Sequence, residues 1–379
     1  MHTKLITELD QMISNFADDL EKRNKDIVLW GTGKFGKTVF QTIKALGKKI
    51  NIIAFGDNNP SKWGTTFENI PIQGELFFKD DPEKYYVVIC SNWENDISAQ
   101  LNRLNIEYTK ESWSILFKSM LMEYYNEYQQ KEIFFPHSAN FYYFCNKADK
   151  LYLNDEVKEK IEKVSDLLHD EHSKELLKQR VDFVLNGDLS LIRDNFSVEQ
   201  EYFDKRYYNS DHITENEVFV DCGGYIGDTV EDFADIMNEC YRKIYVYEPD
   251  TSCFQELIDN IKNKSMNNVI PKKCAVGIKN SQTQEADFPT ISLDEDIKER
   301  VSWIKMDIEG HEMDALKGAQ NIIQQYKPKL AICLYHCVED LYEIPLYLHK
   351  LVPEYRFKLG QHFRGHWDFV LYADTYQYV

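Results

Sequence analysis

Charged side chains stand at the end of a strand-like run in WIKMDIEGHEMDALKGA, residues 303–319. In an extended strand Lys305 and Asp307 face the same side, whereas strands of a parallel sheet are usually apolar on both faces. Burying either charge without a partner costs several kcal/mol. The pattern therefore predicts that these two side chains pair with each other, with Glu309 or with a ligand.

Proton transfer from a hydroxyl is the chemistry that such residues can perform. An aliphatic hydroxyl is scarcely ionised at neutral pH, so a base must take its proton as a new bond forms, or a metal must lower its pKa. Asp307 is one candidate. His336 is the other, because it follows the apolar run KLAICLY and an unshifted imidazole titrates near neutral pH. Lys305 and Glu309 complete the set of catalytic candidates.

Structural and metal-binding alternatives stay open for the same residues. A histidine after a strand is often only hydrogen-bonded, and Glu309 can simply favour the N-terminus of the helix that follows. Asp307, Glu309 and His336 could also bind a divalent ion. Their order in the chain fixes no metal geometry, so the metal is left unassigned.

A glycine-rich turn follows an earlier apolar run in VFVDCGGYIGDT, residues 218–229. Glycines let a ligand approach the backbone closely. The spacing G-G-x-x-G departs from the G-x-G-x-x-G of dinucleotide folds, whose middle glycine makes room for a pyrophosphate. The next run, KIYVYEPD, ends at Glu248, which places a carboxylate beside the turn, where it can hold two ribose hydroxyls. The pair predicts a ligand with a ribose and no pyrophosphate.

A second glycine pattern, LWGTGKFGKT, satisfies two motifs at once. Gly31, Gly33 and Gly36 spell G-x-G-x-x-G, and the same segment spells a P-loop. A P-loop protein needs an acid at the end of a second apolar strand, but YYVVICSN ends in Ser and Asn. The dinucleotide pattern requires an acid about 20 residues further on, and Asp57 supplies it. We favour nucleotide binding at these four residues; a glycine turn with no ligand is the alternative.

Two stretches of the chain alternate strand-like runs with helix-like segments, which is typical of βαβ units. Residues 109–216 between them are poor in Gly and predict a mainly helical connector. We expect a Rossmann-like domain with an N-terminal helix over residues 1–108, and a doubly wound sheet ending in a hairpin over residues 217–379. The expected strands are residues 27–30, 51–55, 85–90, 217–222, 243–248, 268–276, 303–308, 329–335, 355–359 and 368–373.

The segments DCGGYIGDT, YEPD, CAVG, TISLDE, WIKMDIEGHEMDALKGA and KPKLAICLYH, in this order, resemble the FkbM family of S-adenosylmethionine-dependent methyltransferases. The most specific element is K-x-D-x-E-G-x-E followed by L-K-G-A. The resemblance implies an α/β fold with a seven-stranded class I methyltransferase sheet. It also implies O-methylation of a sugar, a sugar nucleotide or a related polysaccharide or natural-product precursor. The implied cofactor contacts are Asp221, Gly223, Gly224, Gly227, Thr229 and Glu248, with Ala275 and Val276 near the adenine.

The run FGDNNPSKWGTTFENIPIQG resembles the nucleotide-sugar-associated domains of bacterial polysaccharide enzymes, which implies a ribose beside Asp57. Two other functions remain as alternatives. One is a nicotinamide-dependent oxidoreductase acting on a nucleotide sugar, and the other is a nonenzymatic nucleotide-binding interaction protein. Tyr202 and Phe203, just before the second sheet, can close over a substrate or simply pack.

Acidic residues outnumber basic ones, 63 to 44, and the formal net charge is -19. Such a surface repels a phosphate backbone, so we expect no nucleic acid partner. No uncharged apolar run approaches the roughly 18–20 residues that cross a bilayer, and the start lacks a secretory apolar core, so we expect no membrane span and a cytoplasmic location. The eight cysteines fit buried, reduced thiols. The oligomeric state stays open, a homo-oligomer included.

Overall fold

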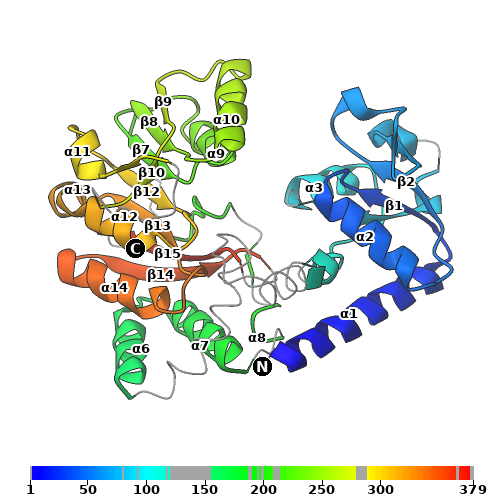
Figure 1. Ribbon diagram of the computed structural model, residues 1–379, viewed down its shortest axis with the longest axis horizontal. Helices are drawn as coiled ribbons and strands as arrows, with labels where there is room; N and C mark the ends of the chain where they lie inside the picture. The colour runs from blue at the N-terminus through cyan, green and yellow to red at the C-terminus, as the bar shows by residue number, and fades with distance from the viewer. Residues whose placement is uncertain are drawn as a thin grey trace. The chain divides into compact units, whose positions relative to one another are not determined.

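The computed structural model describes residues 2–78, 81–91, 94–116, 118–119, 155–186, 190–193, 196–197, 200–207, 214–278, 288–363 and 367–375. The described residues divide into two compact units, an N-terminal unit up to residue 119 and a C-terminal unit from residue 155 onward. Figure 1 labels the elements of both units.

The N-terminal unit is built on a six-stranded sheet with the order β3-β4-β2-β1-β5-β6. Its strands are parallel except for the short β3–β4 pair. Strand β1 lies at the centre, between β2 and β5, as the Rossmann-like prediction requires. The elements are α1 (His2–Arg23), β1 (Asp26–Trp30), α2 (Lys34–Ala45), β2 (Ile52–Gly56), β3 (Thr66–Phe67), β4 (Ile70–Gln73), β5 (Tyr85–Ile89), α3 (Glu94–Arg103) and β6 (Tyr108–Thr109), with 3-10 turns at Pro60–Lys62, Glu75–Phe78 and Pro82–Lys84.

Both faces of this first sheet are covered. Ile27 and Leu29 of β1 belong to the apolar cluster that includes residues of α1 and α2. Val28 and Trp30, which point the other way, belong to a second cluster with residues of α3. A strand that is buried on both faces needs a continuous apolar run. The run IVLW therefore predicts a strand of a parallel sheet.

The C-terminal unit contains a seven-stranded sheet with the order β14-β15-β13-β12-β7-β8-β9. Strands β9, β8, β7, β12 and β13 run parallel, and β15 and β14 form the predicted antiparallel hairpin at one edge. The elements are α6 (Asp155–Leu167), α7 (Glu171–Asn186), α8 (Ser190–Arg193), β7 (Val218–Cys222), α9 (Asp228–Ile236), β8 (Lys243–Tyr247), α10 (Thr251–Asn263), β9 (Val269–Lys272), β10 (Ala275–Val276), β11 (Thr290–Ile291), α11 (Leu293–Asp296), β12 (Trp303–Met306), α12 (Glu312–Gly318), α13 (Gln320–Tyr326), β13 (Lys329–Cys333), α14 (Asp340–Leu351), β14 (Arg356–Gln361) and β15 (Phe369–Asp374).

The strand order decides where a site can form. Strand β7 has β8 on one side and β12 on the other, so the chain leaves β7 in one direction and later returns to its opposite side. In open sheets of this kind ligands bind at the carboxyl ends of the strands where the order reverses. The glycine turn after β7 and the acidic segment after β12 therefore meet at one edge of the sheet.

The helices at the start of the C-terminal unit pack against the elements near one edge of this sheet. Helix α6 packs against α14, and α7 packs against β14, as Figure 1 shows. Residues 155–186, which we expected in a connector, thus contribute two helices to the C-terminal unit. The segment 200–207 also belongs to this unit, and Phe203 packs its ring against Phe219 and Trp303.

Two local expectations differ from the structure. The run at residues 268–276 forms two strands because the chain turns at Cys274, whose N–H donates to Lys272 O at 3.0 Å. Strand β10 then pairs with β11 in a separate two-stranded sheet. The second difference concerns the cysteines expected to be buried and reduced: Cys222, Cys274 and Cys333 are buried, whereas Cys240 is exposed, and all four are free thiols. Among the described residues, no helix is long and apolar enough to cross a membrane.

Candidate active site

The glycine turn after β7 is pressed against the chain that leaves β12. Gly223 has φ +85°, and a Cβ placed on it would lie 1.9 Å from the carbonyl oxygen of Asp307. Gly224 packs against Val246, where an added Cβ would approach Cγ2 to 2.1 Å. Gly227, with φ +93°, immediately precedes helix α9. Only glycine fits a left-handed backbone at such close contact, so the sequence spacing has a direct steric cause.

Glu248 lies beside this turn, as its position after β8 predicts. Its Oε2 accepts a hydrogen bond from the N–H of Tyr225 at 2.9 Å, and its Oε1 accepts one from the N–H of Asp250 at 2.8 Å. Burial raises the pKa of Glu248, and the two N–H donors partly offset the increase. A carboxylate has about four acceptor positions, so both oxygens keep capacity for hydroxyl donors.

The other residues proposed to contact a cofactor lie on neighbouring elements. Thr229 is buried in the first turn of α9. Ala275 and Val276 form β10, and Val276 is buried while Ala275 is partly exposed. Asp221 is different, because its carboxylate is fully buried inside β7 and points into the unit.

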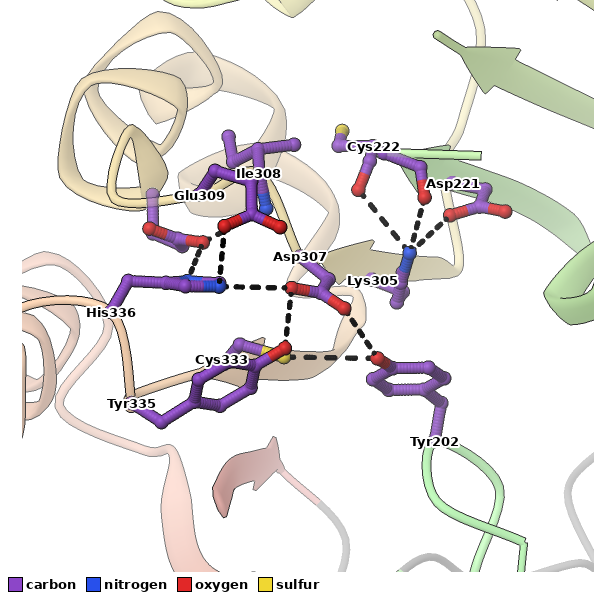
Figure 2. Close-up of polar contacts among 12 residues, drawn as sticks. Tyr202, Asp221, Cys222, Lys305, Asp307, Ile308, Glu309, Cys333, Tyr335 and His336 are labelled. Carbon is purple, nitrogen blue, oxygen red and sulfur yellow. Dashed lines mark hydrogen bonds and ion pairs between the residues drawn. The ribbon is translucent and has the colours of Figure 1, made fainter. Parts of the chain in front are cut away.

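Lys305 pairs with Asp221 and not with Asp307 or Glu309. The two residues are neighbours in the register of β12 and β7, so their side chains face the same side of the sheet. Their Nζ and Oδ1 atoms lie 3.0 Å apart, and Lys305 also donates to Gly223 O at 2.6 Å (Figure 2). Burial raises the pKa of Asp221 to about 6, although the Lys305 charge lowers it. Our expectation of partners was wrong because it considered one strand and not its neighbour.

Asp307 is a partly exposed carboxylate at this edge, with 23% of its side chain accessible. Its Oδ2 accepts a hydrogen bond from the hydroxyl of Tyr202 at 2.9 Å, and its Oδ1 accepts one from Tyr335 at 3.0 Å. Burial alone would raise the pKa of Asp307, but the charges of Lys305 and His336 and the two phenols outweigh it and lower the pKa. The carboxylate is therefore ionised and ready to accept hydrogen bonds.

His336 lies among carboxylates (Figure 2). Its Nε2 is 3.4 Å from Asp307 Oδ1 and 3.5 Å from Glu309 Oε2. Its Nδ1 is 2.8 Å from Glu312 Oε1, which also accepts from the N–H of Ile308 at 2.9 Å. Burial would lower the pKa of His336, but the charges of Glu312, Asp307 and Glu309 raise it to about 10. The imidazole is thus far from the unshifted group that the sequence suggested.

The structure brings most of the predicted residues of the C-terminal unit to one edge. Carboxylate oxygens of Asp307 and Glu309 each lie within 3.5 Å of Nε2 of His336, and the glycine turn touches Asp307. Sequence reasoning assigned no role to Tyr335 or Glu312. The signals were present: Tyr335 adjoins His336, and Glu312 is the last acid of the K-x-D-x-E-G-x-E run. Tyr202, for which two roles stayed open, makes a polar contact with Asp307.

Comparison with known proteins identifies the family of the segment that forms this edge of the sheet. Residues 221–359 match the sequence family described as the methyltransferase FkbM domain. Residues 221–359 of this chain are an FkbM methyltransferase domain. The match includes the glycine turn, Glu248, the acidic segment and His336, so the predicted enzyme class, a methyltransferase, is confirmed.

One solved structure agrees with the fold of the FkbM domain and of the α/β unit that precedes it in the chain. Methyltransferase FkbM from Methylobacillus flagellatus KT is 20% identical, and the match covers 97% of this chain and 100% of that chain with a TM-score of 0.54. The predicted class I methyltransferase sheet preceded by an α/β domain is thereby confirmed as a fold. An rRNA methylase from Streptococcus thermophilus is 14% identical over 48% of this chain and 99% of that chain, with a TM-score of 0.36. No curated protein sequence matches the chain.

The unit that precedes the FkbM domain matches a different family. Residues 23–111 match the family described as C2185-like, N-terminal. Its glycines behave unequally: an added Cβ would lie 2.3 Å from Cys90 O at Gly31 and 1.9 Å from Gly31 O at Gly36, but would meet nothing within 4 Å at Gly33. Gly31 and Gly36 are therefore explained by packing alone.

Asp57, the expected ribose ligand of that unit, already has partners. Its Oδ2 accepts hydrogen bonds from Lys62 Nζ at 2.9 Å and from the Thr32 hydroxyl. Burial would raise the pKa of Asp57, but Thr32, Lys62 and the N–H of Asn59 lower it. A ribose would have to compete with the Lys62 ammonium. Nucleotide binding at Gly31, Gly33, Gly36 and Asp57 stays a prediction.

We expect Gly223→Ala to disrupt the FkbM domain. The Cβ would collide with backbone at 1.9 Å on a residue with φ +85°, and a backbone clash plus a left-handed alanine should destabilise the fold by about 2–4 kcal/mol. Gly33→Ala is the control, because its Cβ meets open space and should change stability by no more than about 1 kcal/mol. Urea unfolding followed by circular dichroism measures both. Equal stability of the two variants would contradict the steric argument.

Proposed function

We propose that the FkbM domain transfers the methyl group of S-adenosylmethionine to a hydroxyl of a sugar, a sugar nucleotide or a related polysaccharide or natural-product precursor. One observation carries the proposal. The glycine turn contacts Glu248 through Tyr225 N–H on one side and approaches Asp307 through Gly223 on the other. A ribose-binding carboxylate and a hydroxyl-binding carboxylate thus flank one glycine-lined turn.

The cofactor side of the site consists of residues that suit an adenosyl group. Glu248 can accept hydrogen bonds from the two ribose hydroxyls, and Gly223 and Gly224 allow the ligand to lie against the backbone. Ala275 and Val276 present small apolar side chains for the adenine. When bound, S-adenosylmethionine supplies a sulfonium methyl group, whose displacement depends mostly on alignment. Lys305 contributes by fixing the turn, since its ammonium donates to Gly223 O at 2.6 Å.

The acceptor side is polar and centred on Asp307. Its carboxylate can accept a hydrogen bond from the acceptor hydroxyl and take the proton as the new C–O bond forms. The Asp307 side chain is 23% exposed, whereas that of His336 is 3% exposed, so an acceptor can reach Asp307 but not the imidazole. The phenols of Tyr202 and Tyr335 add donors and acceptors for neighbouring hydroxyls. Such a set suits a polyhydroxylated acceptor better than an apolar one.

Charge favours a small acceptor over RNA. The formal net charge is -19, and a phosphate backbone is held mainly by Lys and Arg contacts. The three carboxylates of Asp307, Glu309 and Glu312 lie around His336, so the acceptor side itself is acidic. A polyanionic strand would be repelled where the reaction takes place.

Glu248→Ala tests the cofactor. S-adenosylhomocysteine should bind the wild-type chain in isothermal titration calorimetry, and the variant should bind at least about 100-fold more weakly, because two hydrogen bonds to a charged acceptor are lost. Glu256→Ala is the matched control, since Glu256 is exposed on the neighbouring helix α10. No heat of binding with the wild-type chain would end the proposal.

The acceptor is best found by screening. Purified chain with radiolabelled S-adenosylmethionine can be offered nucleotide sugars, free sugars and RNA in parallel. Label in an alkali-stable ether on a sugar supports the proposal, and label in RNA alone contradicts it.

A further inference from the structure

The buried His336 is surrounded by more negative charge than its imidazole can balance. Asp307 and Glu309 approach Nε2 of His336 at 3.4 and 3.5 Å, and Glu312 approaches Nδ1 at 2.8 Å. Three formal negative charges thus surround a ring that carries at most one positive charge. Lys305 does not complete the balance, because its ammonium is 3.0 Å from Asp221.

Several polar atoms of this cluster are buried without a hydrogen-bond partner. Within the described residues, Glu312 Oε2 and His336 Nε2 have none, and neither has Oδ2 of Asp340, a carboxylate that interacts electrostatically with Glu312 and His336. Glu312 is 0% exposed and His336 is 2% exposed. Figure 2 shows Nε2 of His336 directed between Asp307 and Glu309. Buried polar atoms are nearly always satisfied by protein, water or an ion, so this arrangement indicates a ligand.

We propose that Asp307, Glu312 and His336, with Glu309 beside them, bind one divalent first-row metal ion. One ligand atom from each of Asp307, Glu312 and His336 can be chosen so that all lie within 4.8 Å of one another. Metal–oxygen bonds of about 2.1–2.4 Å place opposite ligands about 4.2–4.8 Å apart. The residues therefore need little movement to reach a common ion.

The donor types restrict the ion. Carboxylates suit Mg²⁺ and Mn²⁺, whereas an imidazole suits Mn²⁺, Fe²⁺, Co²⁺ or Zn²⁺ better than Mg²⁺. Glu312 has one oxygen for each role: its Oε1 meets Nδ1 of His336 and the N–H of Ile308, and its unpartnered Oε2 is the atom left for the ion. A carboxylate on the second ring nitrogen is the usual support of a metal-binding histidine. The ion replaces the Nε2 proton and offsets the charges of Asp307 and Glu309.

The consequence for the reaction rests on the proposed function. A cation next to Asp307 would lower the pKa of an acceptor hydroxyl that binds there. The binding of the ion itself does not depend on any acceptor or on S-adenosylmethionine.

The test measures the metal alone. The full chain is treated with EDTA, dialysed and titrated with Mn²⁺, with free Mn²⁺ read by electron paramagnetic resonance. We expect one ion per chain, at least about 100-fold weaker binding in His336→Gln, and about 10–100-fold weaker binding in Glu312→Gln. Asp314→Asn is the matched control, because it changes another carboxylate of α12 that pairs with the exposed Lys317, and its affinity should equal that of the wild type.

Two further measurements distinguish failure of the metal site from failure of the proposed function. Mn²⁺ at about 100 times its Kd should raise the Tm of the wild-type chain, which needs no variant to fold. S-adenosylhomocysteine is titrated into the same samples. If the wild-type chain binds Mn²⁺ but does not bind S-adenosylhomocysteine, the proposed function is overturned and the metal site is not. Absence of Mn²⁺ binding to the wild-type chain, or equal binding by His336→Gln, overturns the metal site.

Discussion

Asp307→Asn is expected to lower kcat for methyl transfer by about 10²–10⁴-fold, the usual contribution of a general base. The amide keeps the shape of the side chain and can still accept one phenol hydrogen bond. It cannot take a proton from the acceptor. Binding of S-adenosylhomocysteine should stay within about twofold of wild type, because Glu248 and the glycine turn are untouched.

Tyr335→Phe is the control for this variant. It removes one hydrogen bond to Asp307, at 3.0 Å, and leaves the carboxylate in place. We expect a loss of about 10-fold or less in kcat, in line with one hydrogen bond to a charged group. Radiolabel transfer under saturating substrate measures both variants. Wild-type turnover by Asp307→Asn would remove Asp307 from the reaction, whereas equal losses in both variants would assign it a positioning role.

Lys305→Met is expected to destabilise the FkbM domain by about 3–5 kcal/mol. The substitution keeps the length of the side chain but leaves the carboxylate of Asp221, which is 0% exposed, without its cation. It also removes the donor to Gly223 O. Removing one partner of a buried pair is costly because the remaining charge stays out of water. The midpoint of urea unfolding, followed by circular dichroism, measures the change.

Two comparisons make this result specific. Asp221→Asn combined with Lys305→Met should recover a large part of the loss, because no uncompensated charge remains. Lys317→Met breaks an exposed pair with Asp314, whose side chains are 45% and 44% exposed, and should change stability by less than about 1 kcal/mol. If Lys305→Met is no more harmful than Lys317→Met, the buried pair is not what holds the turn.

The sequence predicts those features of the site that depend on local chain geometry, namely the strands, the glycine turn and the position of Glu248. Apolar runs buried on both faces identify β7, β8 and β12, and the tight turn after β7 demands glycine at Gly223. Glu248 could be placed because β8 lies next to β7, the ordinary neighbour in a βαβ unit. Each of these inferences needs only the chain direction and the period of a strand.

The partners of the charged side chains could not be read in the same way. Lys305 meets Asp221 because β12 pairs with the side of β7 opposite to β8, which brings together residues 84 positions apart in the sequence. Figure 2 shows the contact between the two side chains. Tyr202 reaches Asp307 from a segment outside the FkbM match. The raised pKa of His336 comes from Glu312, Asp307 and Glu309, which lie in one short segment that the fold brings against a histidine 24 positions after Glu312.

The amino-acid pattern alone predicts the two α/β sheets, the glycine turn and the acid at the end of β8, since strand periodicity and backbone sterics act between near neighbours in the chain. The folded chain is needed to know which charge neutralises which, which phenols hold Asp307 and what surrounds His336. Electrostatic contacts join whatever side chains the fold places within a few ångströms, and that proximity is a property of the assembled sheet.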